Sequence, residues 1–341
     1  MKVGVGMLEK MLEQVYGIKS EEYMQVESFN AFRGNGNYYF VADPGPKDEE
    51  EIEELQKLAA HLAAYGDTNV PALLPTQSGT LLAQWENKRF CLLTCQLSER
   101  KANQRLGRRL AKFHERGRFV PFQVQKSSRI GNWKQLWEAR MDQMEKVWSE
   151  KIFQPSDEQF EKLFIESFPY YLGLAENAVQ YLVDTEIDDD PLDSDSGTVC
   201  HERFSEYTWG KRYIIKNPMD WVFDHRSRDL AEWARGRYFH NSRTCGPEIT
   251  AFLANYQEVA PLSPFSWRLL VARLLFPVHY LETIETYYSA SRESDRRASE
   301  ERLAAIIRKS DDYEQFLAGF FALAHAPVAS KLPRPEWLMA K

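Results

Sequence analysis

Apolar residues follow a helical spacing and then strand-like spacings along the first fifty residues. Residues 7–16 carry apolar side chains three and four positions apart and end before Gly17, which predicts a short amphipathic helix. Two aromatic-rich runs follow, VESFNAF (26–32) and NYYFVAD (37–43), separated by RGNGN. Because the Asn-Gly pair within RGNGN readily adopts the positive φ angles of a tight turn, the two runs predict a β-hairpin.

The pattern returns to helical spacing over residues 48–65 and then to strands. An acidic start, DEEEIEELQ, complements the positive end of the helix dipole, and Gly66 follows the last apolar turn. We assign the run VPALLPT to a loop, and residues 79–97 predict two strands joined by Glu86-Asn87-Lys88. Two strands, a helix and two strands, followed by a polar break at residues 98–100, predict a small α+β domain.

Beyond this break the pattern is almost entirely helical. Most segments carry aromatic side chains every three or four residues, which favours a packed helix-bundle core. Residues 184–198 form a charged interruption that lacks the ordered spacing of a calcium-binding EF-hand, so we expect a solvated loop. Residues 199–233 contain the β-prone run 213–215 and a group of residues able to carry chemistry: His201, Glu202, Glu206, Asp220, Asp224 and His225.

The composition argues against several classes of protein. The 341 residues carry 43 Lys and Arg against 50 Asp and Glu, a formal net charge of −7, which argues against a nucleic-acid partner. A hydrophobic fraction of 43%, with 13% aromatic residues, is sufficient for an ordered core. No segment approaches the roughly 20 apolar residues of a membrane span, and Glu9 interrupts the N-terminus before a signal peptide develops. We therefore expect a soluble protein made in the cytoplasm.

The four cysteines are too few and too dispersed to form a disulfide framework in a chain of this length. Cys91 and Cys95 form a CxxxC pattern within the apolar run FCLLTC, which favours two unreactive strand thiols over a redox pair. No second Cys/His pair stands at zinc-ligand spacing, so the sequence does not indicate a zinc site.

The order of these segments resembles a known family. A small β-rich domain, a polar break and a helical domain with one strand-containing patch are the layout of the protein-kinase-like fold. With LGRRLAKFH (106–114), CHERFSEYT (200–208) and RDLAEW (228–233) in that order, the chain resembles the aminoglycoside phosphotransferase and choline-kinase-like group. Within this group it is most similar to the Bacillus endospore coat-associated proteins of the CotS and YutH type. The resemblance implies a two-lobed α+β fold, with an N-lobe over residues 1–97 and a helical C-lobe over residues 98–341.

The catalytic loop departs from that of the active members of the family. Their loop has His-Gly-Asp, then four residues, then Asn; the Asp accepts the proton of the substrate hydroxyl and the Asn helps to hold Mg²⁺. His201 keeps the first position, and the next three positions have changed: Glu202 stands for the Gly, Arg203 for the Asp and Thr208 for the Asn. Because the pKa of arginine exceeds about 12, Arg203 cannot act as a general base at neutral pH.

The second metal-binding carboxylate of the family is missing from its expected position. It lies twelve residues before the Asp of the Asp-Leu-Ala helix start, and counting back from Asp229 gives Asn217. An amide is a poorer ligand for Mg²⁺ than a carboxylate, and Asp220 takes this place only if the loop is three residues shorter. Asp224 matches an Asp that coat-protein relatives also carry, for which we expect a structural role.

The phosphate-binding parts of the N-lobe are missing as well. The strand Lys that grips the α- and β-phosphates in the family falls in NYYFVAD, where the hairpin places Val41, and no Lys occurs between Lys19 and Lys47. RGNGN joins two strands as a plain hairpin turn and is not a Gly-rich phosphate loop. Without the strand Lys, Glu53 and Glu54 have no ion-pair partner, and we expect them to be solvated. If a nucleotide cleft persists, the family implies a hinge at the end of the strand CLLTCQL: Thr94, Cys95 and Gln96.

These departures favour a pseudokinase with a structural or scaffolding role in the spore coat, without a cofactor and with other spore coat proteins as partners. The alternative is an active small-molecule phosphotransferase that uses ATP and Mg²⁺ with rearranged carboxylates, chosen from Glu202, Glu206 and Asp220. A metal-dependent hydrolase built on His201, Glu202, Asp224 and His225 is disfavoured, because these residues lack a metalloprotease spacing. We interpret His114, at the end of its helix, as a packing side chain.

Overall fold

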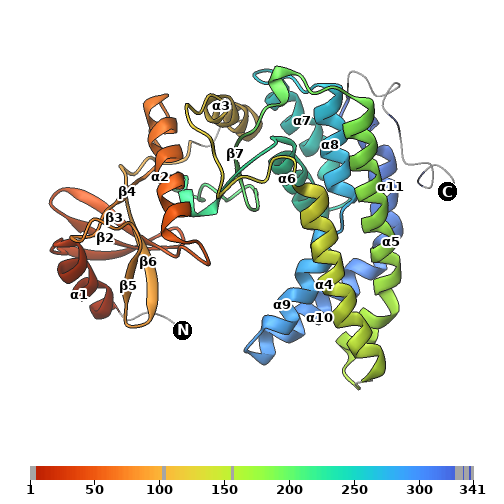
Figure 1. The fold of residues 1–341 in the computed structure, drawn as a ribbon, viewed down its shortest axis with the longest axis horizontal. Coiled ribbons are helices and arrows are strands. Elements are labelled where there is room, and N and C mark those ends of the chain that lie inside the picture. The colour runs from red at the N-terminus through yellow and green to blue at the C-terminus, as the bar shows by residue number, and fades with distance from the viewer. Residues whose placement is uncertain (1–4, 102–104, 155–156, 327–332, 334–337, 339–341) are drawn as a thin grey trace. The chain divides into compact units, whose positions relative to one another are not determined.

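The chain divides into two compact units in the computed structural model, which describes residues 5–101, 105–154, 157–326, 333 and 338 (Figure 1). The first unit comprises Met1–Arg129, Gly197–Asp229 and Ala254–Pro261, and the second comprises Ile130–Ser196, Leu230–Leu253 and Leu262–Lys341. The candidate catalytic loop therefore belongs to the same compact unit as the N-terminal strands. The lobe boundary that the sequence predicts between residues 97 and 98 stays a prediction.

The first unit is built on an antiparallel sheet of short strands. The strand order is β1-β2-β3-β6-β4, and β5 pairs with the first residues of β6. The strands are β1 (Glu22–Val26), β2 (Phe29–Gly34), β3 (Asn37–Ala42), β4 (Ala72–Leu74), β5 (Ala83–Trp85) and β6 (Lys88–Thr94). Phe40 of the inner strand β3 lies opposite Leu93 of β6, and both side chains are fully buried.

Both predicted hairpins form. Asn35 and Gly36 adopt φ angles of 51° and 75° between β2 and β3, which is the left-handed region that an Asn-Gly pair favours. Glu86 and Asn87 adopt φ angles of 46° and 62° between β5 and β6. These turns confirm the strand pairs that the sequence predicted on either side of them.

Two stretches of this sheet differ from the sequence prediction. Residues 26–32 do not form one strand, because Glu27, with a φ of 53°, turns the chain from β1 into β2. Residues 70–76 are not all loop, because Leu73 pairs with Leu93 and β4 covers the outer edge of β6. The three-residue strand β4 is too short for an alternating pattern to reveal it in the sequence.

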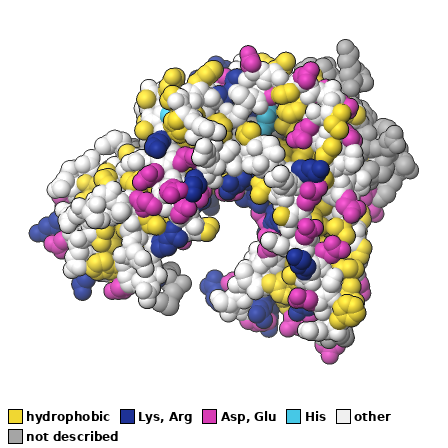
Figure 2. Space-filling view, in the orientation of Figure 1, with side chains coloured by type: hydrophobic (Ala, Val, Ile, Leu, Met, Phe, Trp, Pro, Cys, Tyr) yellow, Lys and Arg dark blue, Asp and Glu magenta, His cyan; other side chains and the backbone are white. Residues whose placement is uncertain are grey.

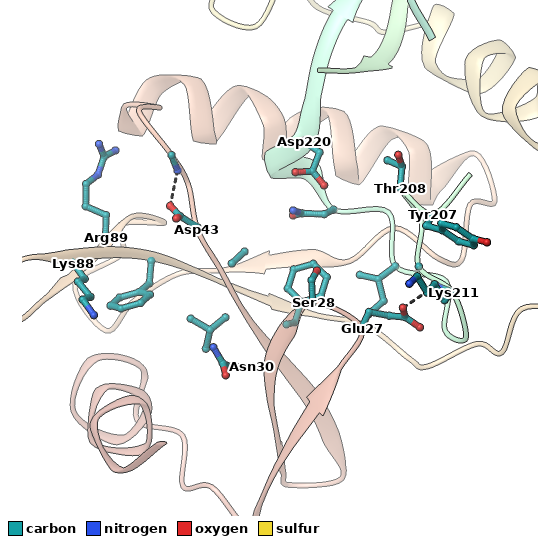
Figure 3. Close-up of a pocket in the computed structure, with 18 of the residues that line it drawn as sticks. Glu27, Ser28, Asn30, Asp43, Lys88, Arg89, Tyr207, Thr208, Lys211 and Asp220 are labelled. Atoms are coloured by element: carbon teal, nitrogen blue, oxygen red, sulfur yellow. Dashed lines mark hydrogen bonds between the residues drawn. The ribbon is translucent and has the colours of Figure 1, made fainter. Parts of the chain in front are cut away.

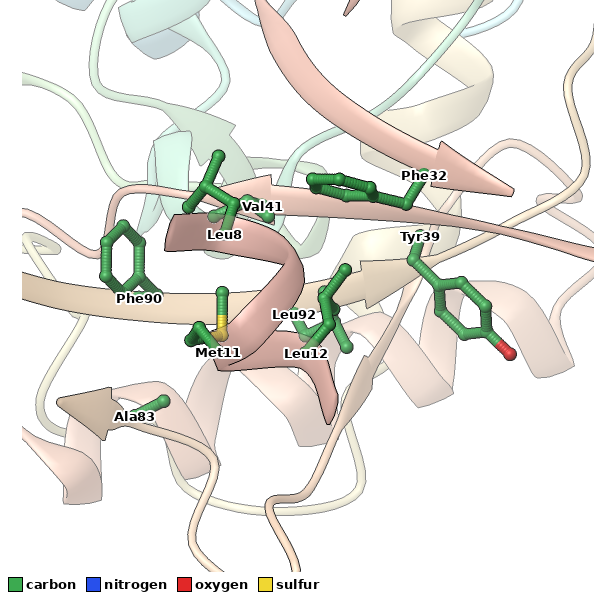
Figure 4. Packing of buried hydrophobic residues seen from close by; sticks show 9 residues of the cluster. All are labelled: Leu8, Met11, Leu12, Phe32, Tyr39, Val41, Ala83, Phe90 and Leu92. Carbon is green, nitrogen blue, oxygen red and sulfur yellow. The ribbon is translucent and has the colours of Figure 1, made fainter. Parts of the chain in front are cut away.

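Helix α1 (Val5–Tyr16) packs its apolar side onto the sheet (Figure 4). Leu8, Met11 and Leu12 are fully buried in it, at about 1.5–3 kcal/mol of stabilisation for each side chain. They share one cluster with side chains of the strands, namely Phe32, Tyr39, Val41, Ala83, Phe90 and Leu92. The helix predicted over residues 7–16 is confirmed.

Helix α2 (Glu49–Ala64) begins at the N-cap Asp48, whose carboxylate accepts the N–H of Glu51 at 2.8 Å. The carboxylate of Glu49 accepts the N–H groups of Leu81 and Leu82 at 2.6 and 3.0 Å, which ties the first turn of the helix to the segment before β5. The helix predicted over residues 48–65 is confirmed, and it buries an apolar stripe formed by Ile52, Leu55, Leu58 and Leu62.

Helix α3 (Leu106–Arg118) lies close against strand β7 (Thr198–His201) in the first unit. The hydroxyl of Thr198 donates to the carbonyl oxygen of His114 at 2.6 Å. A Cβ atom on Gly117 would lie 2.9 Å from the backbone nitrogen of Val199, so only glycine allows the helix to approach the strand this closely.

Strand β7 pairs antiparallel with β8 (Trp221–Asp224), with His201 opposite Trp221. The β-prone run 213–215 between them is not a strand, because only Tyr213 forms a bridge there, with Glu99. The hairpin therefore holds the two ends of the candidate loop, residues 202–220, close together.

The second unit is a bundle of helices, as the aromatic spacing predicts. Trp137 stacks on Phe276 with ring centroids 4.5 Å apart, and Phe160 stacks on Tyr287 at 3.6 Å. None of the described helices is long and apolar enough to cross a membrane. The bundle contains α4 (Trp133–Phe153), α5 (Gln159–Asp188), α8 (Pro264–Leu275), α9 (Val278–Ser289), α10 (Glu293–Arg308), α11 (Ser310–Leu323) and parts of α6 (Ser227–His240) and α7 (Cys245–Gln257).

The acidic segment 184–198 is more ordered than the sequence indicates. Helix α5 continues to Asp188, and Asp195 is buried in the short 3-10 helix η1 (Asp193–Asp195). The carboxylate of Asp195 accepts the hydroxyl of Ser263 at 2.7 Å, so the prediction of a solvated loop is wrong at this residue. On the face shown in Figure 2, acidic side chains lie interspersed with basic ones, so the net charge is not gathered in one place there.

We expect Leu12→Ala to lower the free energy of unfolding by about 2–5 kcal/mol, because it leaves a cavity between α1 and the sheet. Gln14→Ala, on the exposed side of the same helix, is the matched control and should change it by less than about 0.5 kcal/mol. Urea unfolding followed by circular dichroism measures both variants. Equal effects would show that α1 does not pack on the sheet.

Candidate functional site

A pocket of about 970 Å³ lies within the first unit (Figure 3). Its walls come from the turn between β1 and β2, the end of β3, the turn between β5 and β6, and residues 207–220. Four positions that the sequence singled out line it, namely Val41, Thr208, Asn217 and Asp220. The other candidate positions are not among its lining residues, namely His201, Glu202, Arg203, Glu206, Thr94, Cys95 and Gln96.

His201 is held by the buried carboxylate of Asp229 in the first turn of α6. Asp229 accepts hydrogen bonds from the backbone N–H of His201 at 2.9 Å, from Nδ1 of its ring at 2.6 Å and from Nε2 of His114 at 3.1 Å. The indole N–H of Trp209 donates to Nε2 of His201 at 2.9 Å, which places the ring proton on Nδ1. These four side chains are buried, and none lines the pocket, so His201 anchors the loop and does not face a substrate.

Burial and hydrogen bonding set the protonation of this cluster. Burial alone acts to raise the pKa of Asp229, but the electrostatic attraction of His201 and the hydrogen bonds from both histidines hold that pKa well below its usual range. Burial lowers the pKa of His114, which is therefore a neutral imidazole at neutral pH. Its Nδ1 accepts the hydroxyl of Tyr256 at 2.8 Å, so both ring nitrogens of His114 are used inside the core.

The residues considered for a metal-dependent hydrolase are engaged in other contacts. Glu202 and Asp224 both pair with Arg228, at 3.0 and 2.8 Å, and Nδ1 of His225 accepts the N–H of Ser227 at 3.1 Å. One group in the described part of the chain offers three metal-binding atoms close together, and it is fully buried and hydrogen-bonded: His114, Cys200 and Asp229. The structure therefore gives no support to the hydrolase.

Of its changed residues, the loop after His201 exposes Arg203, whereas Glu202 and Thr208 are half-buried. Arg203 is exposed and donates to the carbonyl oxygen of Glu202 at 2.7 Å, so its guanidinium does not fill the pocket. The hydroxyl of Thr208 donates to the carbonyl oxygen of Arg203 at 3.3 Å. Glu206 pairs with Arg100 at 3.8 Å. The loop is thus held by contacts within it and by Arg100. Of the predicted site residues in this loop, Thr208 lines the pocket.

Asn217 and Asp220 lie at the two ends of a short turn that includes the 3-10 helix η2 (Pro218–Asp220). The side-chain oxygen of Asn217 accepts the N–H of Met219 at 3.1 Å, so this amide caps the turn. Asp220 keeps exposed surface over the pocket (Figure 3), and desolvation by the surrounding protein raises its pKa. Which of the two residues corresponds to the carboxylate of the family stays a prediction, and of the two only Asp220 offers a charge.

The predicted hinge begins at Thr94, the last residue of strand β6. The hydroxyl of Thr94 donates to the carbonyl oxygen of Tyr38 at 2.9 Å, which places it inside the sheet. Burial raises the pKa of Cys95 to about 11 and that of Cys91 to about 12, so both thiols stay protonated at neutral pH. A contact between a ligand and this segment stays a prediction.

The carboxylate of Glu54 binds a row of backbone N–H groups. It accepts those of Gln125, Lys126 and Ser127 at 2.7, 3.2 and 2.8 Å, together with the hydroxyl of Ser127 at 2.6 Å. The prediction that Glu54 is solvated is therefore wrong. Partial burial acts to raise its pKa, but these hydrogen bonds outweigh it and lower the pKa. No local pattern reveals a partner that lies more than seventy residues away.

Glu27 makes the same kind of contact at the edge of the pocket, and the sequence did not single it out. Its carboxylate accepts the N–H groups of Lys211, Arg212 and Tyr213 at 2.8, 2.7 and 2.7 Å. Partial burial acts to raise the pKa of Glu27, but the three hydrogen bonds lower it. A sequence signal for the β1–β2 turn would have placed Glu27 at a turn. It would not have identified its hydrogen-bond partners, which lie more than 180 residues away.

Lys216 is a buried cation beside the pocket. Its ammonium group bonds to the carboxylate of Asp67, and it lies 4.4 Å from the ring centroid of Trp209. Burial lowers the pKa of Lys216 to about 8, although Asp67 opposes this shift. Both of its sequence neighbours line the pocket but Lys216 does not, so it cannot replace the missing strand Lys there.

We expect Asp229→Asn to lower the free energy of unfolding by about 3–5 kcal/mol, because His114 and His201 lose a buried charged acceptor. Asp220→Asn, the same substitution at the pocket, is the control and should change it by less than about 1 kcal/mol. Urea unfolding at neutral pH measures both. Similar stabilities of the two variants would contradict an anchoring role of Asp229.

The lowered pKa of Lys216 predicts that the free energy of unfolding rises in alkaline solution. Its pKa in the folded chain, about 8, lies below the ordinary value of 10.5, so the unfolded chain binds more protons between these values. Stability should therefore rise with pH in this window by up to about 1.4 kcal/mol per pH unit. Lys216→Met should lose this contribution, whereas Lys112→Met, on the exposed side of α3, should keep it. Denaturant unfolding across the window checks this, and parallel curves for all three proteins would refute it.

Comparisons with known proteins give the family. The model of the family described as "Spore coat putative kinase YutH" matches residues 9–320. The "Endospore coat-associated protein YutH" of Bacillus subtilis (strain 168) is 42% identical over 335 residues, which cover 97% of this chain and 98% of that protein.

Solved structures give the fold. An aminoglycoside phosphotransferase from Alicyclobacillus acidocaldarius matches with a TM-score of 0.60 and 14% identity, covering 95% of this chain and 97% of that one. A spectinomycin phosphotransferase in complex with ADP and spectinomycin matches with a TM-score of 0.56 and 16% identity, covering 90% and 95%. At these identities the likeness shows the fold alone, and it confirms the predicted α+β, protein-kinase-like fold. The chain belongs to the YutH family of spore coat putative kinases.

Proposed function

We propose that this chain is a pseudokinase with a structural or scaffolding role in the spore coat. Its family and its 42% identical coat-associated relative support a place in the coat, with other coat proteins as partners. The kinase-like fold supplies a pocket, and the side chains that line this pocket support a role other than phosphoryl transfer.

The observation that carries the proposal is the position of positive charge around the pocket. Phosphoryl transfer requires cations that neutralise the charge developing on the phosphate. Val41 lines the pocket from β3, where the family places its phosphate-binding Lys, and it also belongs to the apolar cluster under α1. Lys88 and Arg89 lie at one end of the pocket, away from Asp220, and Lys211 lies at the other end beside Glu27 (Figure 3).

The residues of the pocket also fit Mg²⁺ poorly. Mg²⁺ prefers an octahedral set of oxygen ligands, usually with one or two carboxylates besides the phosphates. Asn217 uses its amide oxygen to cap a turn, and the hydroxyl of Thr208 is bonded within its own loop. The carboxylate of Asp43 accepts the N–H of Gly45 at 2.8 Å, and that of Glu27 is occupied by three N–H groups.

One observation favours the alternative, an active phosphotransferase that uses ATP and Mg²⁺. The carboxylate of Asp220 lies over the pocket with a raised pKa, as a general base for a hydroxyl group requires. The other two candidates are paired outside the pocket, Glu202 with Arg228 and Glu206 with Arg100. The alternative therefore depends on Asp220 alone.

Nucleotide binding separates the two functions. A ligand present at a hundred times its Kd stabilises a protein by about 2.7 kcal/mol, so an ATP site should raise the melting temperature. We expect no rise with ATP and Mg²⁺, and no ADP release by the purified protein in a coupled assay. ADP release that Asp220→Asn abolishes would overturn the proposal in favour of the phosphotransferase.

The proposed role in the coat is tested by localisation in sporulating cells. A fluorescent fusion of the Asp220→Asn variant should reach the spore coat of sporulating cells to the same extent as the wild-type fusion, because scaffolding requires the folded surface and no catalytic carboxylate. A variant that folds, as shown by its circular dichroism, but fails to reach the coat would contradict a purely structural role.

A further inference from the structure

Three consecutive backbone N–H groups converge on one carboxylate at the edge of the pocket. Those of Lys211, Arg212 and Tyr213 donate to the carboxylate of Glu27 at 2.8, 2.7 and 2.7 Å. Successive N–H groups that point to one place form a nest, a concave site that binds anions. Glu27 is the anion in this nest, and it comes from a turn 184 residues before Lys211.

Gly210 gives the nest its shape. It adopts a φ of +93°, and a Cβ atom there would lie 2.1 Å from the carbonyl oxygen of Tyr213. The same Cβ would lie 3.0 Å from the side chain of Glu27. A larger residue at position 210 would therefore clash with the nest and with its anion, and glycine keeps that space open.

The resident carboxylate comes from a tight turn at the edge of the pocket. Val26 pairs with Phe29, so Glu27 and Ser28 form a two-residue hairpin loop, in which Glu27 adopts a positive φ of 53°. Only the side chain of Glu27 reaches the nest, so an external anion could take over the same N–H groups without any change in the strands β1 and β2.

Positive side chains surround the nest. Lys211 and Arg100 lie on the ring of Tyr207, 5.1 and 5.8 Å from its centroid, and Lys211 and Arg212 are exposed. Arg212 pairs with Glu99 at 3.3 Å on the surface. Arg100 is paired as well, with Glu206 at 3.8 Å, so the positive charge that favours an anion comes from Lys211, which also lines the pocket.

The nest opens into the pocket. Glu27, Tyr207, Gly210 and Lys211 line the pocket, and in Figure 3 Glu27, Tyr207 and Lys211 lie at the end away from Arg89. An anionic group in the nest would therefore belong to a ligand whose remaining atoms enter the pocket.

The nest that holds Glu54 shows the contrast with a purely structural contact. It also consists of three N–H groups, from residues 125–127, but it adds the buried hydroxyl of Ser127. Glu54 lies within helix α2 with an ordinary helical backbone, and neither it nor residues 125–127 line the pocket. Access to the pocket is thus found at Glu27 and not at Glu54.

We propose that the nest of residues 211–213 is an oxyanion-binding site, in which the phosphate or carboxylate group of a ligand replaces the carboxylate of Glu27. The site does not depend on the proposed function, because it requires neither catalysis nor its absence. Inorganic phosphate and glutarate are the probes for the two kinds of anionic group.

Glu27→Ala vacates the nest and is the decisive variant. It should bind inorganic phosphate at least about tenfold more tightly than the wild type in calorimetric titration, because the competing carboxylate is gone. Glu22→Ala, which removes an exposed charge from β1, should bind phosphate as weakly as the wild type. In nuclear magnetic resonance spectra of the ¹⁵N-labelled full chain, phosphate should shift the amide signals of residues 211–213 in Glu27→Ala.

Glu27→Gln keeps the side-chain shape and removes only the charge, so it serves if Glu27→Ala fails to fold, and it should also bind phosphate more tightly than the wild type. Shifts of the same amide signals by phosphate alone would assign the site to phosphate groups, and shifts by both probes would assign it to oxyanions in general. Equal affinities of the wild type, Glu22→Ala and both Glu27 variants, or shifts confined to other amides, would overturn the proposal.

Discussion

The buried carboxylate of Asp229 joins three segments that are far apart in the sequence: α3 through His114, the end of β7 through His201, and the start of α6. A carboxylate without partners in such a place would cost several kcal/mol, so the core is stable only while these donors face it. His201 also accepts the indole N–H of Trp209, which positions the loop that lines the pocket. The chain therefore needs His201 for its fold, and the presence of this histidine is no evidence of catalysis.

The fold could be predicted to a large extent, because its signals are local. The Asn35-Gly36 turn, the capping residue Asp48 and the apolar stripe of α1 each act within a few neighbouring residues. The errors occurred where an element depends on a distant partner. Strand β4 exists because Leu73 meets Leu93, and Asp195 is buried because Ser263 lies beside it.

The candidate site could be predicted in its chemistry but not in its geometry. The resemblance to the family predicted that Arg203 and Val41 stand where the family has its base and its phosphate-binding Lys. It could not show that Arg203 points to solvent, that Asp67 holds Lys216, or that Glu27 occupies a row of N–H groups. Each of these facts depends on contacts between residues that are distant in the sequence, and neither periodicity nor spacing reports such contacts.

The glutamates whose carboxylates accept backbone N–H groups affect how the stability of the first unit depends on salt concentration. Glu49 and Glu54 are bonded to N–H dipoles at 2.6–3.2 Å, and dissolved ions screen such short contacts far less than they screen pairs of exposed charges. The exposed pair of Arg297 and Glu293 is of the second kind. Part of the acidic charge of the chain thus joins segments that are distant in the sequence, and these hydrogen bonds should persist across a wide range of ionic strength.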